Sequence, residues 1–269
     1  MNAFKNMLAS AKGQVPLGTW VMSASPIIAE AVGCAGFDWG VIDMEHSPLD
    51  LGDVVHLLQA VAATPMLPLL RVPWNDTVMV KRVLDAGAST VLFPFVQNAD
   101  EARRAVAATR YPPQGVRGMA GMSRGSRFGT VANHYQVAND RIGVILQLET
   151  PAALAQLEAI AAVPGVDALF LGPADLSGAM GHVGDMGHPA VVAAMTQAVQ
   201  RCKGLGMPVG TIGGSVEGVN EYRTIGFDYV AIASDLGLLM HAAQVALTAL
   251  RNDAANPRAK PSRKKAGGY

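Results

Sequence analysis

Short apolar runs recur along the chain, and between them lie longer stretches in which apolar residues return every three or four positions. A short run of this kind is typical of a buried strand, and the longer spacing is typical of an amphipathic helix. Eight strands are predicted, at Pro16–Met22, Trp39–Met44, Leu67–Val72, Val91–Val96, Gly143–Leu148, Ala168–Leu171, Pro208–Ile212 and Tyr229–Ala233.

Helical patterns fill the intervals between these strands. They are predicted at Ser25–Ala35, Asp50–Ala62, Thr77–Ala86, Ala99–Thr109, Ala152–Ala162, Pro189–Leu205 and Val216–Thr224, with a last helix at Gly237–Leu250. Eight strand–helix units without a dinucleotide-binding glycine fingerprint favour a closed parallel barrel over an open doubly wound sheet. The fold class is therefore α/β, a TIM-type (β/α)8 barrel. The irregular segment Tyr111–Asp140 is predicted to be a substrate lid at its mouth.

Half of the 269 residues are hydrophobic, which is enough for the large core of such a barrel. No apolar run reaches the roughly 18 residues of a membrane span, and the first 15 residues lack the apolar region of a secretory signal. We therefore expect a cytoplasmic protein without a membrane partner. Cys34 and Cys202 lie in predicted helices without metal-ligand spacing, and both are interpreted as small core residues.

A formal net charge of zero conceals a basic C-terminal tail. Residues 251–269 hold six basic residues and one acidic residue, which leaves residues 1–250 with 15 basic and 20 acidic residues. The tail has no apolar periodicity and is predicted to be disordered, whereas residues 1–250 are predicted to form a single barrel domain. Because the barrel is acidic, a solvated terminus is favoured over a nucleic-acid-binding one.

Carboxylates follow two consecutive predicted strands. Glu149 comes directly after Gly143–Leu148, and Asp175 follows Ala168–Leu171 through a Gly-Pro-Ala turn. The carboxyl ends of neighbouring parallel strands meet at one edge of the sheet, so the two side chains are expected side by side. Two such carboxylates repel each other unless they share a proton or a cation. A divalent metal, which prefers oxygen ligands, is the expected occupant.

Other strand ends add further chemistry. The second strand ends in Asp-Met-Glu followed by His46, which places an imidazole at the rim. Arg71 ends the third strand; if buried, it must either pair with a structural carboxylate or bind an anion, and the anion is favoured. Gln147 lies two positions before Glu149, so both side chains are expected to point into the barrel. The amide of Gln147 could either hydrogen-bond to a substrate oxygen or simply pack in the interior. Backbone amides near Ala174 can hold a carboxylate.

Two observations limit the chemistry. No lysine ends a predicted strand, which disfavours an aldolase that acts through a Schiff base. The chain has no Walker loop and no H-E-x-x-H motif. By pattern alone, Asp85 is a solvated acid near the end of its helix.

Taken together, the motifs resemble those of one family. They are Gly36-Phe37-Asp38-Trp39, Ile42-Asp43-Met44-Glu45-His46-Ser47-Pro48, Arg71-Val72-Pro73-Trp74-Asn75-Asp76, Arg110-Tyr111-Pro112-Pro113-Gln114-Gly115-Val116-Arg117-Gly118, Gln147-Leu148-Glu149-Thr150 and Gly172-Pro173-Ala174-Asp175-Leu176-Ser177. In this order, and over residues 3–250, the chain resembles the HpcH/HpaI family of class II, metal-dependent pyruvate aldolases. The resemblance implies a barrel of the phosphoenolpyruvate/pyruvate superfamily. It also implies a homohexamer, a dimer of trimers, with a swapped C-terminal helix.

The resemblance also implies a role for each matching residue. Glu149 and Asp175 match ligands for Mg²⁺, Mn²⁺ or Co²⁺, His46 matches the catalytic base, and Arg71 matches the residue that steadies the enolate oxygen. Asp85 matches an acid that reaches a neighbouring subunit's site and makes its histidine more basic, which overturns the solvated interpretation. The positions that match the substrate pocket are Arg71, Gln147, Gly172, Pro173, Ala174, Asp175 and Ile212.

The implied reaction is the reversible cleavage of a 4-hydroxy-2-oxo acid to pyruvate and an aldehyde through a metal-stabilised pyruvate enolate. Two alternatives remain: a carbon–carbon lyase like citrate lyase or malyl-coenzyme A lyase, and a non-catalytic binder of a pyruvate-like ligand. The chain departs from the family pattern at Met44, at Ile212 and in the lid segment Met119–Gly129. These departures bear on the aldehyde and leave the chemistry in place.

Overall fold

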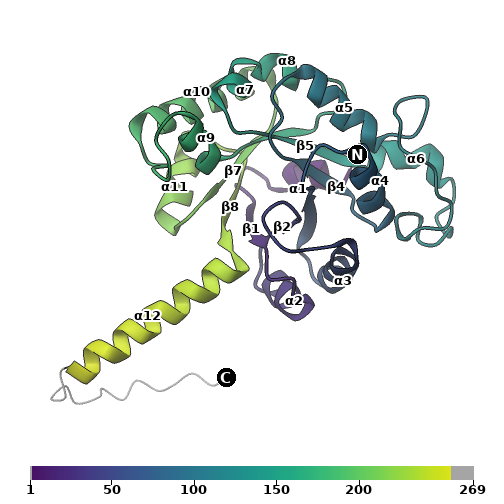
Figure 1. The fold of residues 1–269 in the computed structure, drawn as a ribbon. Coiled ribbons are helices and arrows are strands. Elements are labelled where there is room, and N and C mark those ends of the chain that lie inside the picture. The colour runs from purple at the N-terminus through teal and green to yellow at the C-terminus, as the bar shows by residue number, and fades with distance from the viewer. Residues whose placement is uncertain (1, 256–269) are drawn as a thin grey trace. The chain divides into compact units, whose positions relative to one another are not determined.

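In the computed structural model, which describes residues 2–255, eight parallel strands close into a barrel (Figure 1). Each strand pairs with the next in sequence, and β8 pairs with β1 to complete the ring. The strands are β1 Leu17–Val21, β2 Trp39–Asp43, β3 Leu67–Arg71, β4 Thr90–Phe93, β5 Gly143–Leu148, β6 Ala168–Leu171, β7 Val209–Gly213 and β8 Tyr229–Ser234. The predicted (β/α)8 barrel is confirmed, and the predicted strand ends differ from the observed ones by at most three residues.

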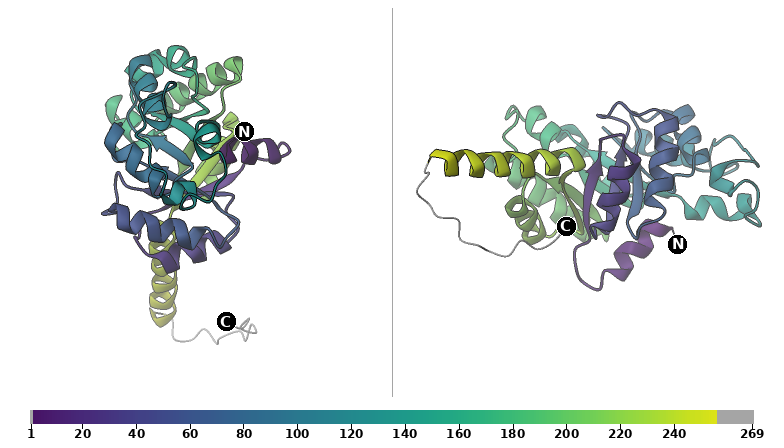
Figure 2. Two further views of the ribbon diagram at one scale, coloured as in Figure 1. Left: turned by 90° about the vertical axis from the view of Figure 1, so that its right-hand side faces the viewer. Right: turned by 90° about the horizontal axis from the view of Figure 1, so that it is seen from below.

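Helices surround the strands of the barrel (Figure 2). In chain order, the helices of the barrel unit are α1 Ala3–Ser10, α2 Pro26–Cys34, α3 Leu51–Val61, α4 Thr77–Asp85, α5 Ala99–Thr109, α6 His134–Arg141, α7 Pro151–Ala155, α8 Leu157–Ala161, α9 Pro173–Ala179, α10 Pro189–Leu205 and α11 Val216–Ile225. The last helix, α12 Asp235–Ala255, lies almost wholly in a second compact unit. Polar side chains start several of them: Asp50 and Asp53 form a reciprocal capping box at α3, and Asp76 accepts from the Met79 amide at α4. Gly226, with φ of 106°, ends α11 in the left-handed conformation.

Three helical features differ from the pattern in the sequence. Helix α1 and helix α6 were not predicted, and the predicted helix at Ala152–Ala162 is divided at Gln156, whose ψ of 9° is not helical. Helix α6 lies within the segment predicted to be irregular. It contains a single buried residue, Ala138, so it carries almost no apolar periodicity. Helix α1 is capped by the side chain of Asn2, which accepts from the Lys5 amide.

Side chains at alternate strand positions fill the barrel interior, as the period of a strand requires. On β2, Trp39 and Val41 belong to this interior cluster, whereas Ile42 belongs to the outer layer between strands and helices. Phe4 of α1 reaches the same cluster and packs edge-on against Tyr229, with ring centroids 5.2 Å apart. Phe4 is fully buried, so its truncation to alanine is expected to destabilise the fold by about 3–5 kcal/mol.

The described chain forms two compact units, one ending at Asp235 and the other beginning at Leu236. The second unit contains nearly all of α12, whose apolar side chains include the exposed Leu239, Val245 and Leu250. The predicted domain boundary at residue 250 and the swapping of this helix both stay predictions. The predicted disordered tail lies largely outside the described residues, from position 256 onward.

The two cysteines have different environments. Cys202 is buried, as predicted, but Cys34 is exposed at the end of α2, so its assignment to the core is wrong. The reason is geometric, because the inward face of α2 is occupied by Ala29 and Gly33. Among residues 2–255, no helix combines the length and hydrophobicity needed to cross a membrane.

Candidate active site

Polar side chains gather at the carboxyl ends of the barrel strands. On β2, Asp43 follows Trp39 and Val41 at the next inward position, and it pairs in register with Arg71, the last residue of β3. On β5, Gln147 follows Ile145 in the same way. The apolar interior therefore ends in a layer of charged and amide groups. This is the end at which TIM barrels carry their active sites.

Arg71 is 6% exposed and is held by two carboxylates. Its Nε and Nη2 donate to the two oxygens of Asp43 at 2.8 and 2.7 Å, and Nη1 lies 2.7 Å from an oxygen of Glu45. Burial alone would lower the pKa of Arg71, but the hydrogen bond to Asp43 and the surrounding carboxylates together raise it. Pairing with structural carboxylates is therefore observed. Binding of an anion by Arg71 stays a prediction.

Glu149 is 2% exposed and is held from two sides. Its Oε2 accepts from the Phe95 amide at 2.9 Å, and its Oε1 accepts from Gln147 Nε2 at 2.6 Å. Gly172 closes a third side, since a Cβ placed there would lie 2.4 Å from Oε1. Burial and the negative charge of Asp175 raise the pKa of Glu149 to about 7, despite the opposing effect of the Phe95 amide.

Asp175 is an exposed residue in the first turn of α9, directly after β6. Its charge acts on both Glu149 and Glu45, so the carboxylates lie near one another as predicted. Helix α9 begins at Pro173 without a side-chain cap, because its N-cap residue is Gly172. Ala174 is exposed beside Asp175 in the same first turn.

His46 lies at the rim, with its side chain 59% exposed. Its Nε2 is 3.8 Å from Glu45 Oε2. Burial raises the pKa of Glu45, against the lowering effects of Arg71 and His46. Glu45 therefore links the imidazole, the guanidinium and the carboxylate pair. Ile212 of β7 is partly buried against the interior cluster below these groups.

Sequence reasoning missed the roles of Asp43 and Glu45. Both residues stood in the motif at the end of β2, but neither was assigned a partner. The available signal was the predicted buried arginine, Arg71, on the adjacent strand, because a buried guanidinium requires nearby carboxylates.

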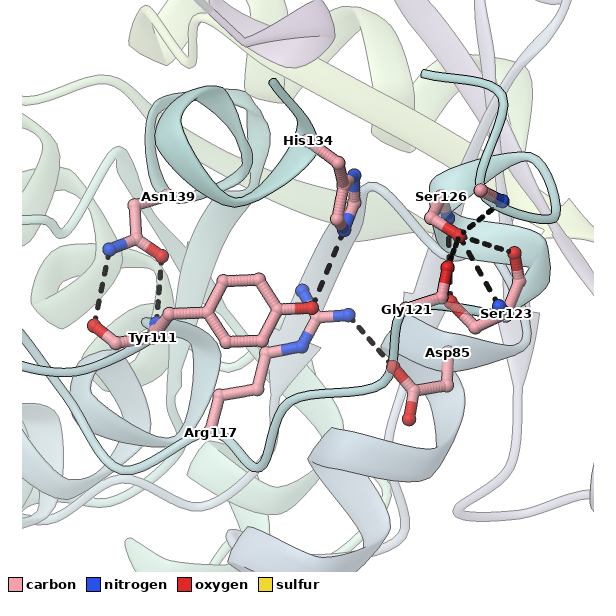
Figure 3. A network of polar contacts seen from close by, with 9 residues as sticks. Asp85, Tyr111, Arg117, Gly121, Ser123, Ser126, His134 and Asn139 are labelled. Carbon is pink, nitrogen blue, oxygen red and sulfur yellow. Dashed lines mark hydrogen bonds and ion pairs between the residues drawn. The ribbon is translucent and has the colours of Figure 1, made fainter. Parts of the chain in front are cut away.

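Asp85, the last residue of α4, is not a solvated acid. Its Oδ1 accepts from Arg117 Nη2 at 2.9 Å, and the Arg117 side chain is 2% exposed (Figure 3). Within one chain, Asp85 therefore pairs with the segment Tyr111–Asp140 and not with His46. This segment joins the end of α5 to the start of β5, so it lies at the amino-terminal end of the strands, and its prediction as a lid at the mouth of the barrel is wrong for the single chain. The predicted contact of Asp85 with a neighbouring subunit stays a prediction.

The residues around Glu149 fit a divalent cation. The buried carboxylate lies beside a second one, and the buried Gln147 Oε1 has no hydrogen-bond partner within the described chain. Among residues 2–255, no three His, Cys, Asp or Glu side chains form a group that could hold a metal ion by themselves. Two carboxylates suit ions such as Mg²⁺, which keep waters or substrate oxygens as their remaining ligands. They do not suit a structural zinc site.

Fold and site together define a TIM-barrel enzyme. The family model described as HpcH/HpaI aldolase/citrate lyase matches residues 17–242. The chain is 52% identical to 2-dehydro-3,6-dideoxy-6-sulfogluconate aldolase of Pseudomonas putida, over 88% of this chain and 92% of that protein. It is 46% identical to pyruvate aldolase of Rhizobium etli, over 89% of this chain and 93% of that protein.

A solved structure agrees with these sequences. The crystal structure of an HpcH/HpaI aldolase/citrate lyase family protein from Burkholderia cenocepacia J2315 superimposes with a TM-score of 0.89 at 41% identity. The match covers 93% of this chain and 100% of that one. The chain belongs to the HpcH/HpaI aldolase/citrate lyase family, and it is an aldolase, a carbon–carbon lyase. The predicted family and class of enzyme are confirmed.

Proposed function

We propose that the protein reversibly cleaves a 4-hydroxy-2-oxo acid to pyruvate and an aldehyde. The observation that carries this proposal is the buried Glu149 beside Asp175, at the same barrel end as the clamped guanidinium of Arg71. Two relatives support it, since one is named a pyruvate aldolase and the other is named for a 2-oxo acid derived from a sulfonated sugar.

We propose that Glu149 and Asp175 hold a divalent metal ion, Mg²⁺, Mn²⁺ or Co²⁺. When bound, such an ion supplies positive charge to the carboxylate and keto oxygens of the substrate and stabilises the negative charge that develops there. The chain fixes the direction of Glu149 through the Phe95 amide, the Gln147 amide and the space left by Gly172. The two hydrogen bonds and this space fix the carboxylate before the substrate binds.

The remaining groups act on the substrate. Arg71, fixed by Asp43, places its positive charge where the keto oxygen gains electron density as the C3–C4 bond breaks. His46 takes the proton from the C4 hydroxyl, as a general base positioned at the rim of the site. The departing aldehyde carries the C4 oxygen, and a proton added at C3 gives pyruvate. The positions that hold the pyruvate part are Gln147, Gly172, Pro173, Ala174 and Ile212.

We further propose that the active protein is a cytoplasmic homohexamer in which Asp85 approaches His46 of a neighbouring subunit. Exposed apolar side chains on α12, among them Leu239 and Leu250, support an oligomer with an exchanged helix. Two free cysteines suit a reducing compartment. Small molecules are the expected partners, without nucleic acid or membrane.

Exchange of the pyruvate methyl protons in D₂O, followed by proton NMR, tests the proposed reaction. We expect exchange that requires Mg²⁺ and stops on addition of EDTA, because formation of an enolate releases a methyl proton. Glu149→Gln should abolish this exchange. The matched control Glu158→Gln changes a half-exposed acid on the outer helix α8 and should leave it unchanged.

The absence of exchange with each of Mg²⁺, Mn²⁺ and Co²⁺ would contradict the proposal. It would then favour a coenzyme A-dependent lyase or a binding protein.

A further inference from the structure

Arg117 is a buried cation that the proposed reaction does not use. It lies in the segment after α5, with a side chain 2% exposed, and its Nη2 is 2.9 Å from Asp85 Oδ1. The guanidinium carbon lies 4.5 Å from the centre of the Tyr111 ring. Figure 3 shows the guanidinium between this ring and the Asp85 carboxylate. Arg117 therefore joins the segment after α5 to the end of α4.

Tyr111 is itself held in place by α6. Its amide donates to Asn139 Oδ1 at 2.7 Å, and Asn139 Nδ2 donates back to the Tyr111 carbonyl at 3.3 Å. Its hydroxyl is 3.4 Å from His134 Nε2 (Figure 3). The ring is 2% exposed. The Tyr111 ring is thus held in a fixed position, and the face of an aromatic ring attracts a cation such as the Arg117 guanidinium.

The position of Asp85 explains why it requires a cation. A carboxylate at the last residue of α4 faces the partial negative charge of the helix carbonyl end, which disfavours it. Arg117, in turn, is too deeply buried to remain unpaired. The pairing therefore limits the conformations open to both side chains. Arg117 engages one oxygen of Asp85, and the acid keeps a side chain 26% exposed, so part of the carboxylate stays accessible from outside the chain.

We propose that Arg117 is the positioning residue of Asp85, fixing the direction in which that carboxylate faces a second copy of the chain. Tyr111 and α6 support Arg117 from behind. The inference rests on the proposed role of Asp85 toward His46 of a neighbouring subunit. It connects the folding of residues 111–141 to the active site of the neighbouring subunit.

Arg124 provides a matched control. It lies in the same segment, and its Nη1 donates to the Ala86 carbonyl at 3.2 Å. It therefore ties the same segment to the end of α4, one residue away from Asp85, without engaging the carboxylate. If anchoring of this segment is all that matters, loss of Arg124 and loss of Arg117 should have similar effects.

The test compares Asp85→Asn, Arg117→Gln, Arg117→Lys and Arg124→Gln in the full-length protein with Mg²⁺. Cleavage of a 4-hydroxy-2-oxo acid is followed for kcat and KM, and thermal unfolding is recorded for each variant. We expect Asp85→Asn and Arg117→Gln to lower kcat by about 100-fold, the size typical of a misplaced catalytic group, while KM changes by less than about threefold. Arg117→Lys should recover part of the loss, and Arg124→Gln should retain kcat.

The pH profile separates positioning from simple charge neutralisation. Loss of the Asp85 charge beside His46 makes the imidazole less basic, so the acid limb of kcat/KM moves to lower pH. If Arg117 positions Asp85, Arg117→Gln moves the limb in the same direction. If Asp85 stayed in place, removal of the nearby cation would move it to higher pH. Glu45 and Arg71, the other charges beside His46 in its own chain, are unchanged in all four variants.

An unchanged kcat in folded Arg117→Gln, together with a low kcat in Asp85→Asn, would overturn the inference while leaving the proposed function standing. Equal losses in Arg117→Gln and Arg124→Gln would also overturn it. If Arg117→Gln fails to fold, Arg117→Lys decides by the direction of its pH shift. Failure of the proposed reaction is seen separately, as the absence of pyruvate proton exchange in the unmodified protein.

Discussion

Two buried acids, one near each end of the barrel, have opposite surroundings. Asp167, just before β6, is 6% exposed and fully compensated: it accepts from Asn2 Nδ2 at 2.9 Å and from the Val144 amide at 2.8 Å, and Lys5 Nζ lies 2.6 Å away. Glu149, just after β5, is as deeply buried but lies beside another carboxylate. Equal burial therefore serves stability at one end. At the other end it raises the pKa of an acid that lies near a second carboxylate, Asp175.

The largest expected effect is on activity at Glu149. Glu149→Gln keeps the size of the side chain and removes its charge, so we expect aldol cleavage with Mg²⁺ to fall by about 100- to 1000-fold. Calorimetric titration with Mg²⁺ should show weakened binding, and the variant should unfold in EDTA at no lower a temperature than the parent. A marked loss of stability in EDTA would mean that Glu149 is a structural acid like Asp167.

The pH dependence of stability sharpens the comparison. In EDTA, the pKa of Glu149 is about 7 in the folded chain, against an ordinary value of 4.5. Between these values the folded chain holds a proton that the unfolded chain releases, so the free energy of unfolding falls as pH rises through this window. The decrease is at most about 3 kcal/mol.

Saturating Mg²⁺ should offset this decrease, so the thermal shift that Mg²⁺ produces is expected to grow from pH 5 to pH 8. Differential scanning calorimetry measures it. Glu149→Gln is the control, because it removes the titrating group. A thermal shift independent of pH in the parent would contradict the proposed pairing of Glu149 with the ion.

Asp167→Asn should lower stability without lowering activity. The substitution removes the charge that Lys5 and the Val144 amide compensate, and hydrogen bonds to charged groups contribute about 1.5–3 kcal/mol each. We expect the free energy of unfolding to fall by about 2 kcal/mol in urea titrations. A loss of kcat in the folded variant would show that the two barrel ends are coupled.

The smallest expected effect comes from one methyl group. Gly172→Ala would place a Cβ 2.4 Å from Glu149 Oε1, so the carboxylate must move. We expect about a tenfold loss of kcat/KM, since misplacement of a catalytic group by a fraction of an ångström is enough to slow the reaction. Gly178→Ala in the same helix, where a Cβ meets nothing within 4 Å, is the control. Equal losses would point to a general effect on α9.

Much of the site could be predicted because strand order decides it. Glu149 and Asp175 follow consecutive buried runs, and parallel pairing of β5 with β6 brings the ends of those runs together. Three-dimensional pairings without a local pattern could not be predicted. Arg117 and Asp85 are 32 residues apart, and the helix that supports Tyr111 has almost no apolar face. Cys34 was misplaced because α2 is apolar on more than its inward side.

One contact of the site is protected from most mutations. The Phe95 amide that binds Glu149 belongs to the backbone, in a residue whose φ of 55° is unusual for a side chain of this size. Every substitution except proline preserves that N–H group, so alanine scanning of the site would report on the Phe95 ring and overlook the amide. Glycine would even relieve the unfavourable φ. The hydrogen bond that orients Glu149, a proposed metal ligand, thus depends on the backbone conformation at Phe95 and not on its side chain.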